Sequence, residues 1–77
     1  MKDILTYIIT AIVEHPKDIT VSETEENGTL SYSVSVAKED MGKVIGKEGK
    51  VIRAVRNIMK IPAIKQGKRI EISLQEV

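Results

Sequence analysis

The chain begins with a helical pattern of apolar residues. Between residues 4 and 14 they recur every three or four positions, and Asp3 is placed to act as the N-cap of a helix. His15 and Pro16 end the pattern, because a residue before proline avoids the helical conformation. The pattern predicts a helix over residues 4–14 with one wide apolar face: Ile4, Leu5, Ile8, Ile9, Ile12 and Val13.

Two stretches of alternating polar and apolar residues follow, at residues 19–24 and 30–36. The second stretch places its large side chains on one face and three serines on the other, which is typical of a strand between a core and water. Asn27 and Gly28 lie between the two stretches, and both residues tolerate positive φ. The pattern predicts a tight β-hairpin.

The second half of the chain predicts two helices around a glycine turn, followed by a last strand. The helices cover residues 39–45 and 50–60, and the strand covers residues 69–74, after a loop at residues 65–68. Pro62 either ends the longer helix or opens an extra turn. The residues expected on the inward face of that helix are Val51, Val55, Ile58 and Met59.

The three predicted strands each have one apolar and one polar face, so the helices should cover one face of the sheet only. The order helix, strand, strand, helix, glycine turn, helix, strand then predicts an α+β two-layer sandwich with a three-stranded mixed sheet. Seventy-seven residues leave no room for a second core. We therefore expect one domain over residues 1–77.

The glycine turn, Gly46-Lys47-Glu48-Gly49, has the features of a phosphate site. Gly46 can take the left-handed conformation that ends a helix, and Gly49 lets another backbone approach closely. Free amides at the start of the next helix carry partial positive charge, and Lys47 and Lys50 add full charges beside them. This pattern favours a bound phosphate. An ordinary turn between two helices has the same two glycines.

Charge is unevenly distributed along the chain, although its net value is only +1. Residues 1–37 hold two basic and six acidic residues, whereas residues 38–60 hold seven basic and three acidic residues. Positive potential is therefore expected around the glycine turn, where it would attract an anionic partner. A solvated helical face accounts for the same basic residues, so charge alone does not separate the two interpretations.

The segment Val44-Ile45-Gly46-Lys47-Glu48-Gly49-Lys50-Val51-Ile52 resembles the core signature of the KH domain, a module that binds single-stranded nucleic acid. In that family the Gly-x-x-Gly loop clamps the backbone of about four nucleotides while their bases lie along an apolar groove. The order of elements is similar to the type II KH topology, in which an extra helix and strand, here residues 1–28, precede a KH core, here about residues 29–75. The resemblance covers the whole chain and is strongest to the small bacterial single-KH family KhpA.

The resemblance to the KhpA family implies a function and a set of partners. It implies a cytoplasmic protein that binds single-stranded RNA as a post-transcriptional regulator or RNA chaperone. It also implies a homodimer, or a heterodimer with a larger KH protein of the KhpB or Jag type. In the groove, Val44, Ile45 and Ile52 would form the helical wall. The residues assigned to the RNA surface are Lys43, Val44, Ile45, Gly46, Lys47, Glu48, Gly49, Lys50, Ile52 and Arg53.

Two other interpretations remain open. A dimerisation or protein-interaction module, in which RNA contact is minor, is favoured by the nearly continuous apolar stretch at residues 58–64. The same stretch could instead fold back onto the core. A DNA-reading helix-turn-helix also contains a glycine turn, but three strands and an apolar entry to its second helix count against it.

Composition argues against several further classes of protein. With one histidine, no cysteine and no convergent pair of carboxylates, we expect neither an enzyme nor a metal or cofactor site. Two tyrosines, with no phenylalanine or tryptophan, argue against base stacking on a sheet. The apolar run near the N-terminus is too short to span a membrane, so we expect no membrane partner. We also expect no small-molecule substrate.

Overall fold

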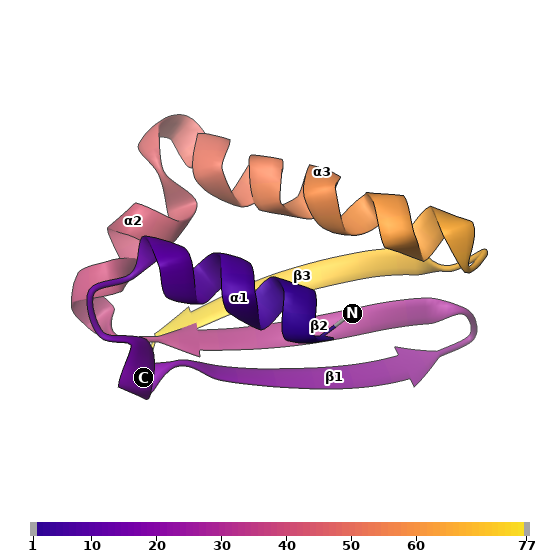
Figure 1. The fold of residues 1–77 in the computed structure, drawn as a ribbon, viewed down its shortest axis with the longest axis horizontal. Helices are drawn as coiled ribbons and strands as arrows, with labels where there is room; N and C mark the ends of the chain where they lie inside the picture. The colour runs from indigo at the N-terminus through magenta and orange to yellow at the C-terminus, as the bar shows by residue number, and fades with distance from the viewer. Residues whose placement is uncertain (1, 77) are drawn as a thin grey trace.

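Three α-helices cover one face of a three-stranded sheet in the computed structural model, which describes residues 2–76 (Figure 1). This two-layer arrangement confirms the predicted α+β fold class. Short 3-10 turns (η) precede β1 and flank the short helix α2. The elements in chain order are α1 (Lys2–Ile12), η1 (Pro16–Asp18), β1 (Thr20–Glu26), β2 (Thr29–Val36), η2 (Lys38–Asp40), α2 (Met41–Ile45), η3 (Lys47–Gly49), α3 (Lys50–Lys65) and β3 (Arg69–Glu76).

The sheet has the predicted mixed pairing, with β2 in the centre. β1 pairs antiparallel with β2, and β2 pairs parallel with β3, so that Tyr32 lies opposite both Glu23 and Ile72. The predicted β1–β2 hairpin is confirmed, because Asn27 and Gly28 both have positive φ, at 52° and 79°. The parallel pairing places β2 and β3 beside each other and leaves the chain between them, α2 and α3, to cross over one face.

The core lies between the inward face of the sheet and the helices. The four large residues of β2 are all buried, whereas its serines are half-buried on the opposite face. Tyr32 donates a hydrogen bond to Glu23 Oε1 (3.1 Å). Burial, together with this hydrogen bond and the negative charge of Glu23, raises the pKa of Tyr32 to about 12. The largest fully buried side chains are Tyr32, Leu5, Ile9, Met59, Val34, Val36, Val44 and Asp40.

Helix α1 begins and ends two residues earlier than predicted. It spans Lys2–Ile12, so Asp3 lies in its first turn and is not its N-cap. At the other end, the amides of Glu14 and His15 donate to the carboxylate of Asp40. These two amides are therefore bonded outside the helix, which cannot continue through them. A residue far along the chain decides where α1 ends.

Helix α3 continues past the predicted end, through Pro62, to Lys65. It ends in a Schellman motif, in which the Gly67 amide donates to the Ile64 carbonyl and the Lys68 amide donates to the Ala63 carbonyl, both at 2.9 Å. Ala63 is 1% exposed, so the last turn of α3 packs on the sheet despite the hydrogen bond that proline removes.

The inward face of α3 also differs from the prediction. Its buried residues are Ile52, Val55, Met59 and Ala63. Ile58, which the sequence pattern placed inward, is 48% exposed, and Val51 is only half-buried. The helix extends to Lys65, so the residues that face the core recur along its whole length at a spacing of three or four. Ile58 lies beside this buried stripe and not in it.

Candidate nucleic-acid interface

The turn between α2 and α3 projects from one end of the molecule, away from the β1–β2 hairpin at the other end (Figure 1). Its four residues, 46–49, include three with positive φ: Gly46 at 77°, Glu48 at 57° and Gly49 at 75°. A hydrogen bond of 3.1 Å from the Gly49 amide to the Gly46 carbonyl closes the turn. The expected Gly-x-x-Gly turn between two helices is present, and we call residues 46–49 the GxxG loop.

The two glycines of the GxxG loop exchange the roles that we expected of them. Gly46 has φ 77° and ψ 173°, a region that essentially only glycine occupies, and is not left-handed helical. A Cβ on Gly46 would lie 2.3 Å from Val51 Cγ2 and 2.8 Å from the Val51 nitrogen. Gly49 is left-handed, and a Cβ there would meet only the Arg53 guanidinium, at 3.9 Å. The close backbone approach is therefore made at Gly46.

The amide groups at the start of α3 have no side-chain cap. The amides of Gly49 and Lys50 donate inside the loop, to the carbonyls of Gly46 and Lys47, so the donors left for an anion are the amides that follow Lys50 in the first helical turn. Helix α3 is 16 residues long, and its dipole adds partial positive charge at the same point. The backbone alone therefore offers donors to a negatively charged oxygen.

The lysines around the GxxG loop differ in their partners. Lys47 and Lys50 are exposed, and neither takes part in an ion pair within residues 2–76. Lys43, in α2, forms an ion pair with Glu14 at the surface. An incoming phosphate would compete with Glu14 for Lys43, whereas Lys47 and Lys50 are available without such competition.

Glu48 is the acidic residue of the GxxG loop, and its backbone is held by a neighbour. Its carbonyl accepts a hydrogen bond from Arg53 Nη2 (3.3 Å), one turn into α3. The Glu48 side chain is exposed, so its negative charge lies at the surface of the loop. This charge opposes phosphate binding.

The apolar residues expected to form a groove wall do not share one environment. Val44 is fully buried and Ile52 is 8% exposed, and both belong to the core. Their placement does not support a role as groove wall; they hold the ends of α2 and α3 that frame the GxxG loop. Ile45 is 37% exposed, so it offers an apolar surface beside the loop.

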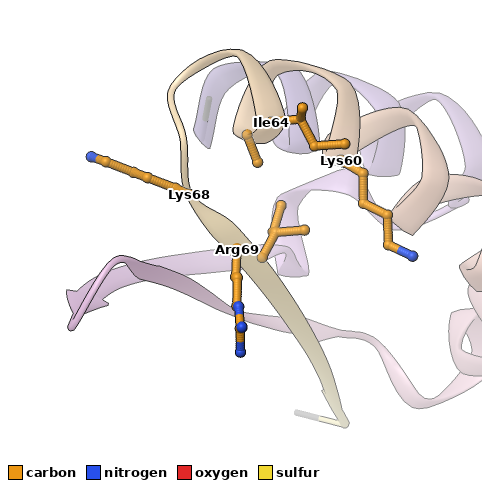
Figure 2. Close-up of a pocket in the computed structure, with 6 residues that line it drawn as sticks. Lys60, Ile64, Lys68 and Arg69 are labelled. Atoms are coloured by element: carbon orange, nitrogen blue, oxygen red, sulfur yellow. The ribbon is translucent and has the colours of Figure 1, made fainter.

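A hollow of about 320 Å³ lies at the far end of α3, against the start of β3 (Figure 2). Its lining is mainly apolar, and Lys68 and Arg69 extend away from it in different directions. Lys68 pairs instead with Glu25 of the hairpin, at 2.9 Å. The hollow is separate from the GxxG loop, and the sequence pattern did not indicate it. Its lining residues are Lys60, Ala63, Ile64, Lys68, Arg69 and Ile70.

Asp40 is a buried carboxylate that positions α2 and thereby the GxxG loop. Its Oδ1 accepts the Glu14 amide (3.0 Å) and its Oδ2 accepts the His15 amide (2.9 Å). Burial alone would raise the pKa of Asp40, but these two amides and the nearby charges of His15 and Lys43 outweigh it and lower the pKa. Sequence reasoning missed this role, because Glu39 and Asp40 look like an ordinary helix start.

Replacing Asp40 with asparagine is expected to destabilise the fold in a pH-dependent way. A pKa that is lower in the folded state adds stability above the ordinary value of 3.8, and this stability is lost as the pH falls through the folded-state pKa. The difference in unfolding free energy between wild type and Asp40→Asn should therefore be larger at pH 7 than near pH 3, in urea titrations followed by circular dichroism.

The matched control for Asp40 is Glu39→Gln, which removes the neighbouring exposed carboxylate. It should change the unfolding free energy little, because the exposed Glu39 side chain takes no part in the hydrogen bonds to Glu14 and His15. A loss for Asp40→Asn that is the same at both pH values would show that the carboxylate charge is not what the two amides require.

Metal and membrane features are absent from the part of the chain that the structure describes. Residues 2–76 contain no cluster of three histidine, cysteine, aspartate or glutamate side chains able to hold a metal ion. No helix within the same residues is long and apolar enough to cross a membrane.

Comparison with known protein families assigns the chain to one of them. The family model for the KH domain of KhpA and KhpB matches residues 2–74, which is nearly the whole chain. The chain belongs to the KhpA/KhpB KH-domain family. The GxxG loop, α2 and α3 all lie inside the matched residues.

Curated relatives in the KhpA/KhpB family match over nearly their full length. The RNA-binding protein KhpA of Chlamydia pneumoniae is 38% identical over 99% of this chain and 97% of its own. The protein of the same name from Listeria monocytogenes is 36% identical over 99% of this chain and 100% of its own. The RNA-binding protein KhpA of Halalkalibacterium halodurans is 39% identical over 96% of this chain and 97% of its own.

Solved structures show the same KH-family fold inside a larger protein. Era from Aquifex aeolicus, bound to GDP·AlF4−, superimposes with a TM-score of 0.67 at 15% identity. Era in complex with MgGDPNP and nucleotides 1506–1542 of 16S ribosomal RNA gives a TM-score of 0.63 at 16% identity. Each match covers 97% of this chain and 29% of the Era chain, so the likeness concerns the fold of one part of Era.

Proposed function

We propose that this chain binds single-stranded RNA by holding the sugar–phosphate backbone against the GxxG loop. The observation that carries the proposal is the left-handed pair Glu48 and Gly49 leading into the uncapped amides of α3, with Lys47 and Lys50 unpaired beside them within residues 2–76. The name RNA-binding protein KhpA, carried by relatives across the whole length of the chain, supports RNA as the ligand.

The clamp works through the backbone first and through side chains second. A phosphate oxygen accepts hydrogen bonds from the amides that follow Lys50 in the first turn of α3, because the Gly49 and Lys50 amides already donate to the Gly46 and Lys47 carbonyls. Lys47 and Lys50 neutralise the phosphate charge. Ile45 gives an adjacent base an apolar surface. The charge of Glu48 weakens the attraction, so one copy of the loop binds RNA weakly. This mode requires no cofactor and suits a cytoplasmic RNA chaperone or post-transcriptional regulator.

The proposal is tested with a Lys47→Asp, Glu48→Asp double variant and a labelled short single-stranded RNA. Fluorescence anisotropy at two salt concentrations should show at least about tenfold weaker binding for the double variant, because a cation that faces phosphate has become an anion. The affinity of the wild type should fall with salt. Aspartate tolerates positive φ, so the loop keeps its conformation.

Two control variants accompany this experiment. Lys17→Asp makes the same change in net charge on η1, outside the loop, and should retain most of the binding. Glu48→Asp alone should bind as the wild type does. Circular dichroism confirms that each variant is folded. Equal binding by wild type and double variant, or no binding by the folded wild type, would contradict the proposal.

A second candidate function is a dimerisation module, favoured by the exposed isoleucines of α3. Ile58, Ile61 and Ile64 are 48%, 60% and 71% exposed. Their spacing is symmetric about Ile61, so an antiparallel α3–α3 pair would place Ile61 against the partner's Ile61 and Ile58 against the partner's Ile64. We propose a second copy of this chain as the occupant, which would bring two GxxG loops to one RNA.

Sedimentation velocity over a range of protein concentrations tests the dimer. The wild type should sediment as a dimer at high concentration, and Ile61→Asp should sediment as a folded monomer, because the exchange buries a charge at the centre of the interface. A wild type that stays monomeric at high concentration would remove the homodimer. A larger KH protein on the same face would then be the remaining occupant to test.

A further inference from the structure

Glu48 has a backbone conformation that its side chain disfavours. Its φ of 57° and ψ of 25° are left-handed helical, and Asn27 is the one other non-glycine residue with positive φ within residues 2–76. Asparagine suits that conformation, because its short polar side chain can bond locally, whereas glutamate has no such advantage. Some other group must therefore stabilise Glu48 in the left-handed state.

Arg53 is the group that contacts this strained residue. Its Nη2 donates to the Glu48 carbonyl at 3.3 Å, and the same atom lies 3.9 Å from the position of a Cβ on Gly49. The guanidinium therefore lies against both left-handed residues of the GxxG loop. Because Arg53 is anchored in the regular first turns of α3, it ties the loop backbone to the helix that follows.

We propose that Arg53 is a positioning residue of the GxxG loop, which favours RNA binding by holding Glu48 left-handed. The loop conformation at Glu48 and Gly49 decides how the chain enters α3, and therefore where the free amides of its first turn point. Arg53 thus acts on the phosphate through the backbone that it orders, in place of the direct phosphate contact expected from its charge. The RNA-binding test of this inference rests on the proposed function. A second test, made on the free protein without RNA, rests on the loop geometry alone.

The RNA test is a double-mutant cycle between Arg53 and residue 48. Glu48→Gln removes the charge and keeps the conformational cost, whereas Glu48→Gly removes both. Arg53→Gln should weaken RNA binding about fivefold in the Glu48→Gln background and less than about twofold in the Glu48→Gly background, because glycine adopts the left-handed conformation unaided. Equal losses in the two backgrounds, or no loss in either, would overturn the proposal.

Salt dependence separates positioning from direct phosphate contact. A side chain that neutralises one phosphate of a single strand contributes a slope of about 0.7 in log affinity against log salt. Arg53→Gln should leave this slope unchanged. Arg56→Gln is the matched control, since Arg56 is exposed on the same helix and makes no hydrogen bond to the loop within residues 2–76. A reduced slope for Arg53→Gln would assign Arg53 to the phosphate itself.

A measurement without RNA makes the two proposals distinguishable. Positive φ brings the amide and α protons of a residue close together, so residue 48 should give a strong intraresidue NOE in the free wild-type protein. Arg53→Gln should weaken this NOE, and Arg56→Gln should not. If the NOE responds but the wild type binds no RNA, the RNA proposal fails and the positioning role of Arg53 in the loop stands. If the NOE does not respond, the positioning role is overturned.

Discussion

Replacing Gly46 with alanine is expected to cost about 2–6 kcal/mol of unfolding free energy. Backbone conformations reserved for glycine cost about 1–3 kcal/mol for other residues. Forcing atoms into a packed site adds about 1–3 kcal/mol. Both apply at Gly46, where a Cβ would lie 2.3 Å from Val51 Cγ2 and 2.8 Å from the Val51 nitrogen. The backbone of α3 cannot withdraw from this contact, because Ile52, the next residue, is buried in the core.

Two other glycines provide a graded control for Gly46→Ala. Gly49→Ala should cost about 1–2 kcal/mol, the penalty of a left-handed residue alone. Gly42→Ala should be neutral or stabilise the fold by up to about 1 kcal/mol, since Gly42 lies in α2 with nothing within 4 Å of a new Cβ. Urea unfolding followed by circular dichroism gives all three values. Equal losses at Gly46 and Gly49 would show that the Val51 contact relaxes freely.

Replacing Met59 with alanine is expected to cost about 2–5 kcal/mol, the usual loss when a buried large side chain leaves a cavity. Met59 is a fully buried residue on the inward face of α3, and it belongs to the same core as Leu5 and Ile9 of α1. A domain of this size has about 5–15 kcal/mol of total stability, so the variant should unfold at a much lower urea concentration.

The neighbouring residue Ile58 is the matched control for Met59. Ile58 is 48% exposed, so Ile58→Ala should change the unfolding free energy of the monomer by less than about 1 kcal/mol. The apolar pattern of the sequence placed both residues inward, which would predict similar losses. Similar measured losses would therefore contradict the orientation of α3 in the structure.

Much of the candidate site could be predicted because its signals are local. A Gly-x-x-Gly turn between two helices, with lysines at positions 47 and 50, is visible in nine consecutive residues. What the pattern could not separate was a groove wall from a core. Val44, Ile45 and Ile52 are similar in chemistry and spacing, but only Ile45 reaches the surface to a substantial extent, at 37%. Their burial depends on how α2 and α3 lie on the sheet.

The sequence by itself determined the order of the elements, the hairpin at Asn27 and Gly28, and the inward face of β2. These features follow from hydrophobic period and turn chemistry, which act between residues close in the chain. Tertiary structure decided where α1 ends, because Asp40, 26 positions from Glu14, takes the amides that the helix would have used. It also decided which glycine is irreplaceable, because only packing brings Val51 against Gly46. Contacts of this kind depend on the distance between atoms in space, which a pattern along the chain does not contain.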